Sequence, residues 1–196
     1  RPLPFASPDR VVVAWGERRA AARERMELSW PEFEDWARES RSFTSVAALP
    51  FATLGATITG AGEPVRIAAV PVSDRFFHVL GARPQLGRTF AEGEDRPGAP
   101  RVIVLSDGLW RSRFGADTAL LERGIVLDGE PYTVIGVMPP AFDFPRATDA
   151  WTTLGATVGY VAEDRRLGFL MMIGRLRDGL APDAARDELS AVVRRL

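Results

Sequence analysis

The fold is decided by one stretch, Arg101–Pro140, which has the sequence RVIVLSDGLWRSRFGADTALLERGIVLDGEPYTVIGVMPP. Its β-branched beginning, Arg101–Leu105, predicts a short buried strand. Ser106 follows directly and is placed to be the N-cap of a helix, whose apolar face includes Leu109 and Trp110. Gly115 is placed to end that helix in the left-handed conformation. The first half of the stretch therefore predicts a strand followed by a capped helix.

The second half of the stretch predicts a β-hairpin. Asp128-Gly129 separates two apolar runs, Ile125–Leu127 and Tyr132–Val137. A two-residue type I′ turn needs positive φ at both central residues, and Asp-Gly is among the pairs that accept this most readily. Pro139-Pro140 then ends the second strand, because proline cannot donate to a strand ladder.

Upstream, residues 28–36 carry an unusually complete helix start. Ser29 and Glu32 form the S-x-x-E pattern of a capping box, and Leu28 can close on Phe33 as a hydrophobic staple. The expected buried face of this helix consists of Trp30, Phe33, Trp36 and Ala37.

The remaining segments predict a mixture of strands and helices. Ser73 is expected to cap a short helix over Asp74–Leu80 that Gly81 ends, and Pro182 to begin a final helix that runs toward Leu196. The charge run Glu17–Glu27 suggests a solvated loop or frayed helix, with a partner-binding loop as the alternative. The expected strands are Val11–Trp15, Ala48–Thr59, Glu63–Val72 after a Gly60-Ala-Gly62 hairpin loop, Ala150–Leu154 and Phe169–Leu176, with a long loop over Gly155–Arg166.

Composition excludes several classes of function. The 196 residues contain no Cys, a single His, and 25 basic residues that are all Arg. Lysine-dependent nucleotide sites, thiol nucleophiles and two-His zinc motifs therefore cannot be built. The net charge of −1 and the absence of a basic face make nucleic acid an unexpected partner. No apolar run is long enough to span a membrane.

Three groups of residues are candidate sites, and a structural role is favoured for each. Glu92, Glu94 and Asp95 could hold Ca²⁺ or serve a carboxylate-dependent hydrolase, but the regular calcium-loop spacing is missing. His78 has no partner constellation for catalysis. Ser106-Asp107-Gly108 could offer N–H groups to an anion, although Ser106 is better explained as a helix cap.

Several motifs together carry a resemblance to a known family. They are VIVLSDGLWRSRFG (102–115), LDGEPYTVIGVMPP (127–140), PEFEDW (31–36), GEPVR (62–66), FFHVLG (76–81) and GRTF (87–90). In this order they resemble the periplasmic core domain of MacB-like ABC-transporter permeases, in particular permeases of acidobacterial type that lack a fused ATPase. The likeness extends over nearly the whole chain.

The resemblance implies a fold and a function. The fold would be α+β, with a porter-like βαβ subdomain formed by 1–88 and 146–196 and an inserted, smaller sabre-like subdomain over 89–145. The function would be that of a non-catalytic periplasmic module of a bacterial membrane permease, which couples the motion of flanking transmembrane helices to export or envelope events.

The implied partners are those flanking helices, a separate ATPase subunit on the cytoplasmic side, and a periplasmic protein or a second permease copy. No catalytic, cofactor-binding or metal-binding residue is assigned, and the residues that contact a ligand or partner are unknown. A soluble periplasmic ligand-binding domain is the alternative, followed by the hydrolase. Both ends of the domain are expected to emerge at one pole, with 101–138 displaced from it.

Overall fold

The structure is a computed structural model that describes residues 7–14, 16–18, 24–52, 54–60, 62–121, 123–155 and 164–193. Its strands are β1 (Val11–Ala14), β2 (Gly16–Arg18), β3 (Glu24–Met26), β4 (Phe43–Pro50), β5 (Leu54–Thr59), β6 (Val65–Val72), β7 (Leu86–Gly87), β8 (Val102–Leu105), β9 (Gly124–Leu127), β10 (Glu130–Val137), β11 (Ala150–Thr153) and β12 (Leu170–Leu176). Its helices are α1 (Trp30–Glu39), α2 (Phe76–Leu80), α3 (Asp107–Phe114) and α5 (Pro182–Val193), with 3₁₀ turns η1 (Pro8–Arg10) and η2 (Thr118–Leu120). The predicted α+β class is confirmed.

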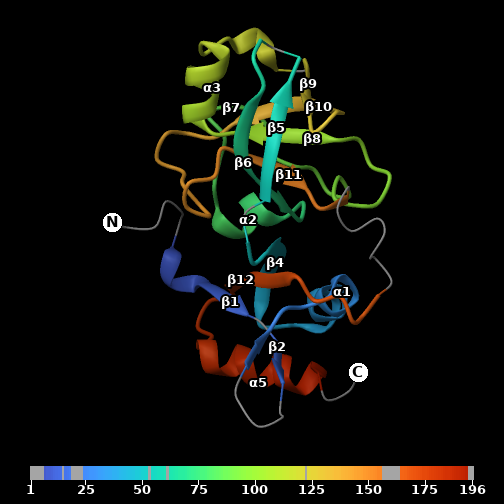
Figure 1. The fold of residues 1–196 in the computed structure, drawn as a ribbon. Helices are drawn as coiled ribbons and strands as arrows, with labels where there is room; N and C mark the ends of the chain where they lie inside the picture. The colour runs from blue at the N-terminus through green and yellow to red at the C-terminus, as the bar shows by residue number, and fades with distance from the viewer. Residues whose placement is uncertain are drawn as a thin grey trace.

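The lower half of the molecule in Figure 1 is built on a small sheet with the strand order β1-β12-β4. Both pairings are antiparallel. Helices α1 and α5 contribute side chains to the same apolar cluster as this sheet. The predicted capping box of α1 is confirmed, since the Ser29 side chain accepts from Glu32 N while the Glu32 carboxylate accepts from Ser29 N. This half therefore holds the first and last described elements of the chain.

One position on the predicted face of α1 is wrong. Ala37 is exposed, and Asp35 is buried in its place with an exposed fraction of 4%. The Asp35 carboxylate binds Arg38 on the next turn and Arg165, whose Nη1 lies 2.8 Å away. Two arginines thus compensate a buried carboxylate that a reading of apolar spacing could not identify.

The upper half is a larger sheet that closes on itself. Its order is β7-β10-β8-β11-β6-β5-β9, and β9 also pairs with β10. Each of the six strands β5, β6, β8, β9, β10 and β11 therefore has a neighbour on both sides, so that they form a closed ring. The short β7 adds to the second half of β10.

The predicted Asp128-Gly129 hairpin is confirmed, and it also helps to close this ring. Both residues have positive φ, 51° and 83°, as a type I′ turn requires. Beyond the turn, the Asp128 carboxylate accepts from Thr57 N at 2.8 Å, and Asp128 N donates to Thr57 O at 2.9 Å. A residue expected only to turn the chain thus also joins β9 to β5.

Two glycines permit a close approach of backbone where β7 meets β10. Gly87 pairs with Gly136 in the antiparallel register. A Cβ on Gly136 would lie 2.2 Å from Arg88 O, and a Cβ on Gly87 would lie 2.2 Å from Ile135 O. The contact between these strands therefore requires that both residues lack a side chain.

The strand and helix predicted from 101–115 are confirmed. All four residues of β8 are buried. Ser106 caps α3 by accepting from Leu109 N at 3.1 Å, and Gly115 ends the helix with φ of 59°. Leu109 and Trp110 of α3 belong to the apolar cluster formed by the inward side chains of the ring.

Other predicted elements differ from the structure in extent. The expected strand Ala48–Thr59 is two strands, β4 and β5, which belong to different sheets and are separated by a bend after Pro50. Residues within Glu17–Glu27, expected as a loop or frayed helix, form the antiparallel pair β2 and β3. The first strand, expected to be buried, is only partly so, and Val13 is 43% exposed.

The remaining strands agree with the prediction or lie partly outside the described residues. The Gly60–Gly62 hairpin joins β5 to β6, and both glycines have positive φ. β11 and β12 match the expected strands, and α5 begins at Pro182 as predicted. The predicted loop over Gly155–Arg166 falls mainly on 156–163, and the last three residues of the predicted final helix are 194–196; both of these ranges are outside the described residues.

Each of the two larger sheets takes its strands from several separate parts of the chain. β5, β6 and β11, which come from 54–72 and 150–153, lie in the closed ring together with β8, β9 and β10 from 102–137. The small sheet takes its strands from 11–14, 43–50 and 170–176. The division into 1–88 with 146–196 and 89–145 stays a prediction.

Candidate functional site

The place where the two sheets meet is occupied by α2. In Figure 1 this short helix lies between the closed ring above and the small sheet below. Its apolar residues Phe76, Phe77, Val79 and Leu80 have exposed fractions of 0–1%. They share one apolar cluster with β4 and β12 of the small sheet and with β6, β8, β10 and β11 of the ring. The main core of the protein is therefore common to both sheets.

Aromatic rings make up much of this junction. Phe77 lies 5.6 Å from Trp151 of β11 and 5.7 Å from Phe142, measured between ring centroids. Phe76 stacks on Phe144 at 6.1 Å. Edge-to-face and offset contacts of this kind fix the orientation of side chains more strictly than aliphatic packing does.

Polar contacts cross the same junction. Ser73, which follows β6 of the ring, donates its N–H to Ala48 O of β4 at 2.9 Å, and its hydroxyl accepts from Ala48 N at 2.9 Å. Ser73 was expected to cap α2, and this expectation is wrong, because its hydroxyl is taken by a strand 25 residues upstream. Arg175 of β12 donates from Nε to Val79 O of α2 at 2.7 Å. The predicted end of α2 at Gly81 is confirmed, with φ of 64°.

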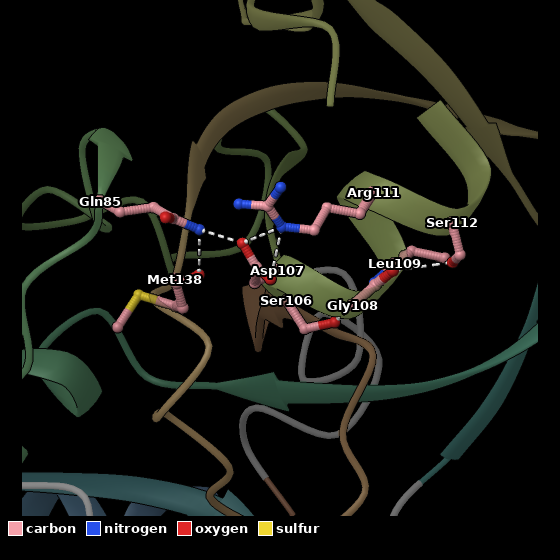
Figure 2. A network of polar contacts seen from close by, with 8 residues as sticks. All are labelled: Gln85, Ser106, Asp107, Gly108, Leu109, Arg111, Ser112 and Met138. Carbon is pink, nitrogen blue, oxygen red and sulfur yellow. Dashed lines mark hydrogen bonds and ion pairs between the residues drawn. The ribbon is translucent and has the colours of Figure 1, made fainter. Parts of the chain in front are cut away.

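A second polar network lies at the first turn of α3 (Figure 2). Gln85 donates from Nε2 to the Asp107 carboxylate at 2.7 Å and to Met138 O at 2.9 Å. Arg111, one turn along α3, donates from Nε to both Asp107 oxygens at 2.9 and 3.0 Å. The network therefore fastens α3 to the segments that lead into β7 and out of β10.

The charge state of Asp107 follows from these contacts. Burial raises the pKa of its carboxyl, but hydrogen bonds from Gln85 and Arg111 outweigh burial and leave the pKa below 3.8. An ionised carboxylate at the first turn of α3 repels anions and competes for the N–H groups there. The arrangement thus favours the capping role of Ser106 over an anion site at residues 106–108.

The three carboxylates weighed for calcium or hydrolysis turn toward different partners. Glu94 accepts from Arg88 at 2.7 and 2.9 Å and from Ala91 N, Asp95 accepts from Asp74 N at 3.0 Å, and Glu92 pairs with Arg75 at 3.3 Å. Burial and the nearby Asp74 raise the pKa of Asp95. Within the part of the chain that the structure describes, no three His, Cys, Asp or Glu side chains gather into a metal-binding group.

His78 also fits its structural interpretation. It lies on α2 with its side chain exposed, whereas the neighbouring Phe76 and Phe77 are buried. The sequence does not indicate that Ser73, Gln85 and Arg175 each join segments that lie far apart along the chain. Their partners are distant in the sequence. The local sequence around Ser73 indicates only a helix cap, and Gln85 and Arg175 stand in no local motif.

Comparison with known proteins identifies the family. A family model described as MacB-like periplasmic core domain matches residues 2–192. The macrolide export ATP-binding/permease protein MacB of Burkholderia pseudomallei (strain 1710b) is 31% identical over 125 residues, which are 62% of this chain and 19% of that protein. MacB of Neisseria gonorrhoeae (strain ATCC 700825 / FA 1090) is 29% identical over 92 residues, 47% of this chain and 14% of that protein. The chain thus matches less than a fifth of the length of these relatives.

Solved structures show the same fold. The periplasmic region of MacB from Actinobacillus actinomycetemcomitans superposes with a TM-score of 0.71 at 14% identity, covering 98% of this chain and 85% of that one. The extracellular domain of the noncanonic ABC-type transporter YknZ from Gram-positive bacteria gives a TM-score of 0.64 at 12% identity, covering 91% and 88%.

Among the described residues, no helix is both long and apolar enough to cross a membrane. The sequence motifs, the superposition on the solved periplasmic region of MacB and the family match over 2–192 agree with one another. The chain therefore belongs to the family of MacB-like periplasmic core domains.

Proposed function

We propose that this chain is a non-catalytic extracytoplasmic module of a bacterial ABC-transporter-type permease. In this proposal it couples the motion of flanking transmembrane helices, driven by a separate ATPase subunit on the cytoplasmic side, to export or envelope events. The observation that carries the proposal is the family match over residues 2–192. The transported substrate does not follow from it, because the MacB relatives that are named for macrolide export match over less than a fifth of their length.

The arrangement of the elements supports a mechanical role. η1 and α5 both belong to the half with the small sheet, and Arg10 of η1 forms an ion pair with Asp178 before α5 at 2.6 Å. The ring lies at the other end of the molecule. A displacement that enters through the small sheet would therefore be carried to the ring, where a periplasmic protein or a second permease copy would receive it.

The chemistry of the described residues supports a non-catalytic role. The single His is exposed, Asp107 is held ionised by Arg111 and Gln85, and the acidic loop residues face separate partners. A nucleophile, a base and an orienting group, which together would suggest hydrolysis, do not converge in the part of the chain that the structure describes.

The test uses the permease that carries this domain, produced together with its ATPase in a bacterial host. Replacing the domain by a flexible Gly/Ser linker is expected to leave ATP hydrolysis in place and to abolish export. Export at the wild-type rate without the domain would overturn the coupling role.

Location is tested in the same permease. The chain has no Cys, so Ala119→Cys on exposed η2 places one thiol in this domain, and any Cys elsewhere in the permease is replaced by Ser first. A membrane-impermeant maleimide is expected to label it in intact cells after permeabilisation of the outer membrane only. Labelling that requires disruption of the inner membrane would refute an extracytoplasmic location.

A further inference from the structure

We propose that α2, together with Ser73 and Arg175, is a rigid joint that makes the small sheet and the closed ring move as one body. Its significance for transport rests on the proposed function, but the rigidity itself is a property of this chain. By sequence, α2 belongs with the sheet that contains the ring, since it connects β6 to β7, yet it packs on β4 and β12 of the small sheet.

Burial at the joint opposes a hinge between the sheets. Phe76, Phe77, Val79 and Leu80 are almost completely buried in the cluster that both sheets share. Rotating one sheet against the other would expose these side chains or force them from their rotamers. Close-packed interiors of this kind resist continuous deformation.

The polar contacts fix the relative orientation of the two sheets at the joint. Ser73 holds both backbone groups of Ala48, one through its own N–H and one through its hydroxyl, so that β4 is fixed next to the end of β6. Ser73 is 2% exposed, so water cannot readily replace the hydroxyl. Arg175 binds the Val79 carbonyl near the C-terminal end of α2, at a second point away from Ser73. Two separate attachments prevent rotation about either one.

The chain offers matched controls for both attachments. Ser106 also accepts a hydrogen bond from a backbone N–H, but it does so entirely within the ring half, at α3. Arg177 also donates from Nε to a backbone carbonyl at 2.7 Å, but its acceptor is Arg41 O, in the half with the small sheet. Ser73→Ala and Arg175→Met therefore weaken the joint, whereas Ser106→Ala and Arg177→Met remove similar bonds elsewhere.

The experiment measures the distance between the two halves. Spin labels are attached at Ala119→Cys on η2 and Ala184→Cys on α5, both exposed positions in a chain without native Cys. Pulsed electron paramagnetic resonance on the 196-residue chain is expected to give one narrow distance peak. Ser73→Ala and Arg175→Met should broaden that peak, and the two controls should leave its width unchanged.

Thermal unfolding separates a loosened joint from general destabilisation. Ser73→Ala and Ser106→Ala are each expected to lower the Tm by roughly 2–6 °C, because each leaves a backbone N–H without its acceptor. Only the first should broaden the distance peak. A broad or double peak in the wild-type chain would overturn the proposal, and so would unchanged widths in both joint variants. Loss of export on removal of the domain depends on none of these results, so the two proposals can fail separately.

Discussion

Substitution of Gly136 by alanine tests whether the contact between β7 and β10 depends on the missing side chain. The new Cβ would stand 2.2 Å from Arg88 O, whereas real Cβ atoms essentially never approach within 3.0 Å. The backbone of Arg88 must therefore retreat by about 0.8 Å, which strains the two hydrogen bonds that fix this segment to β10. These bonds are Arg88 N to Ile135 O and Gln85 N to Val137 O, both 2.9 Å.

The expected loss of stability follows from these two hydrogen bonds to β10. Each contributes about 0.5–1.5 kcal/mol, so losing both would reduce the free energy of unfolding by about 1–3 kcal/mol. For a domain of this size, this corresponds to a decrease in Tm of roughly 2–12 °C. Amide hydrogen exchange should become faster at Gln85 and Arg88, while the amides of the small sheet keep their protection.

Gly129→Ala is the matched control for this prediction. Gly129 has φ of 83° and no atom within 4 Å of an added Cβ, so only backbone strain opposes the substitution. Left-handed strain of about 1–2 kcal/mol, partly offset by about 0.4–1 kcal/mol from the less flexible unfolded chain, leaves a small net loss. Exchange at Gln85 and Arg88 should not change in this variant. A Gly136→Ala protein with wild-type Tm and wild-type protection at these amides would show that the reasoning about close approach is wrong.

Two further changes address the closure of the ring and the docking of α5. Asp128→Ala should lower the free energy of unfolding by about 0.5–1.5 kcal/mol, since Thr57 N loses its acceptor. Asp128→Asn, which keeps an acceptor and tolerates positive φ, should stay near the wild type in urea unfolding, and equal losses in both variants would contradict the assigned bond. Glu188 on α5 accepts from Arg41 N and Ser42 N, both at 2.8 Å. Burial raises its pKa, but hydrogen bonding by the Ser42 side chain and by the backbone N–H groups of Arg41 and Ser42 outweighs burial and holds the pKa below the ordinary value of 4.5. The Glu188 contribution to stability is therefore fully present above pH 4.5 and is lost as the pH falls through the lower folded-state pKa. Glu188→Gln should unfold more readily than the wild type at neutral pH, and the difference in free energy of unfolding between the two proteins should shrink in acid. A difference that stays constant down to about pH 3 would contradict the hydrogen bonds assigned to Glu188.

Local features of the fold could be predicted from the sequence because their partners lie a few residues apart. The capping box of Ser29 and Glu32 and the turn at Asp128-Gly129 each satisfy their own backbone groups, and both are present. The break between β4 and β5 was missed, because an apolar run continues through it and only the assignment of strands to sheets reveals that the chain changes layer.

The junction between the sheets could not be predicted for a related reason. Ser73 has the local signature of a helix cap, and the partner that takes its hydroxyl, Ala48, is brought near by the whole fold. The burial of Asp35 likewise depends on Arg165, which is remote in the sequence. Reasoning from neighbouring residues identifies which groups need a partner, but not which distant segment will supply it.

The closed ring has a consequence for how this domain can meet other proteins. Strands β5, β6, β8, β9, β10 and β11 each pair with a neighbour on both sides over at least part of their length, so none of the six is an edge strand along its whole length. Recognition by strand addition, which requires a long open edge, is therefore restricted to short stretches of these six strands. Apart from the two-residue β7 at the end of this sheet, the surface that this half offers to another protein consists mainly of side chains and loops, and loops vary more freely in sequence than the elements they connect. The architecture of the ring can therefore stay the same while the side chains and loops on its surface change.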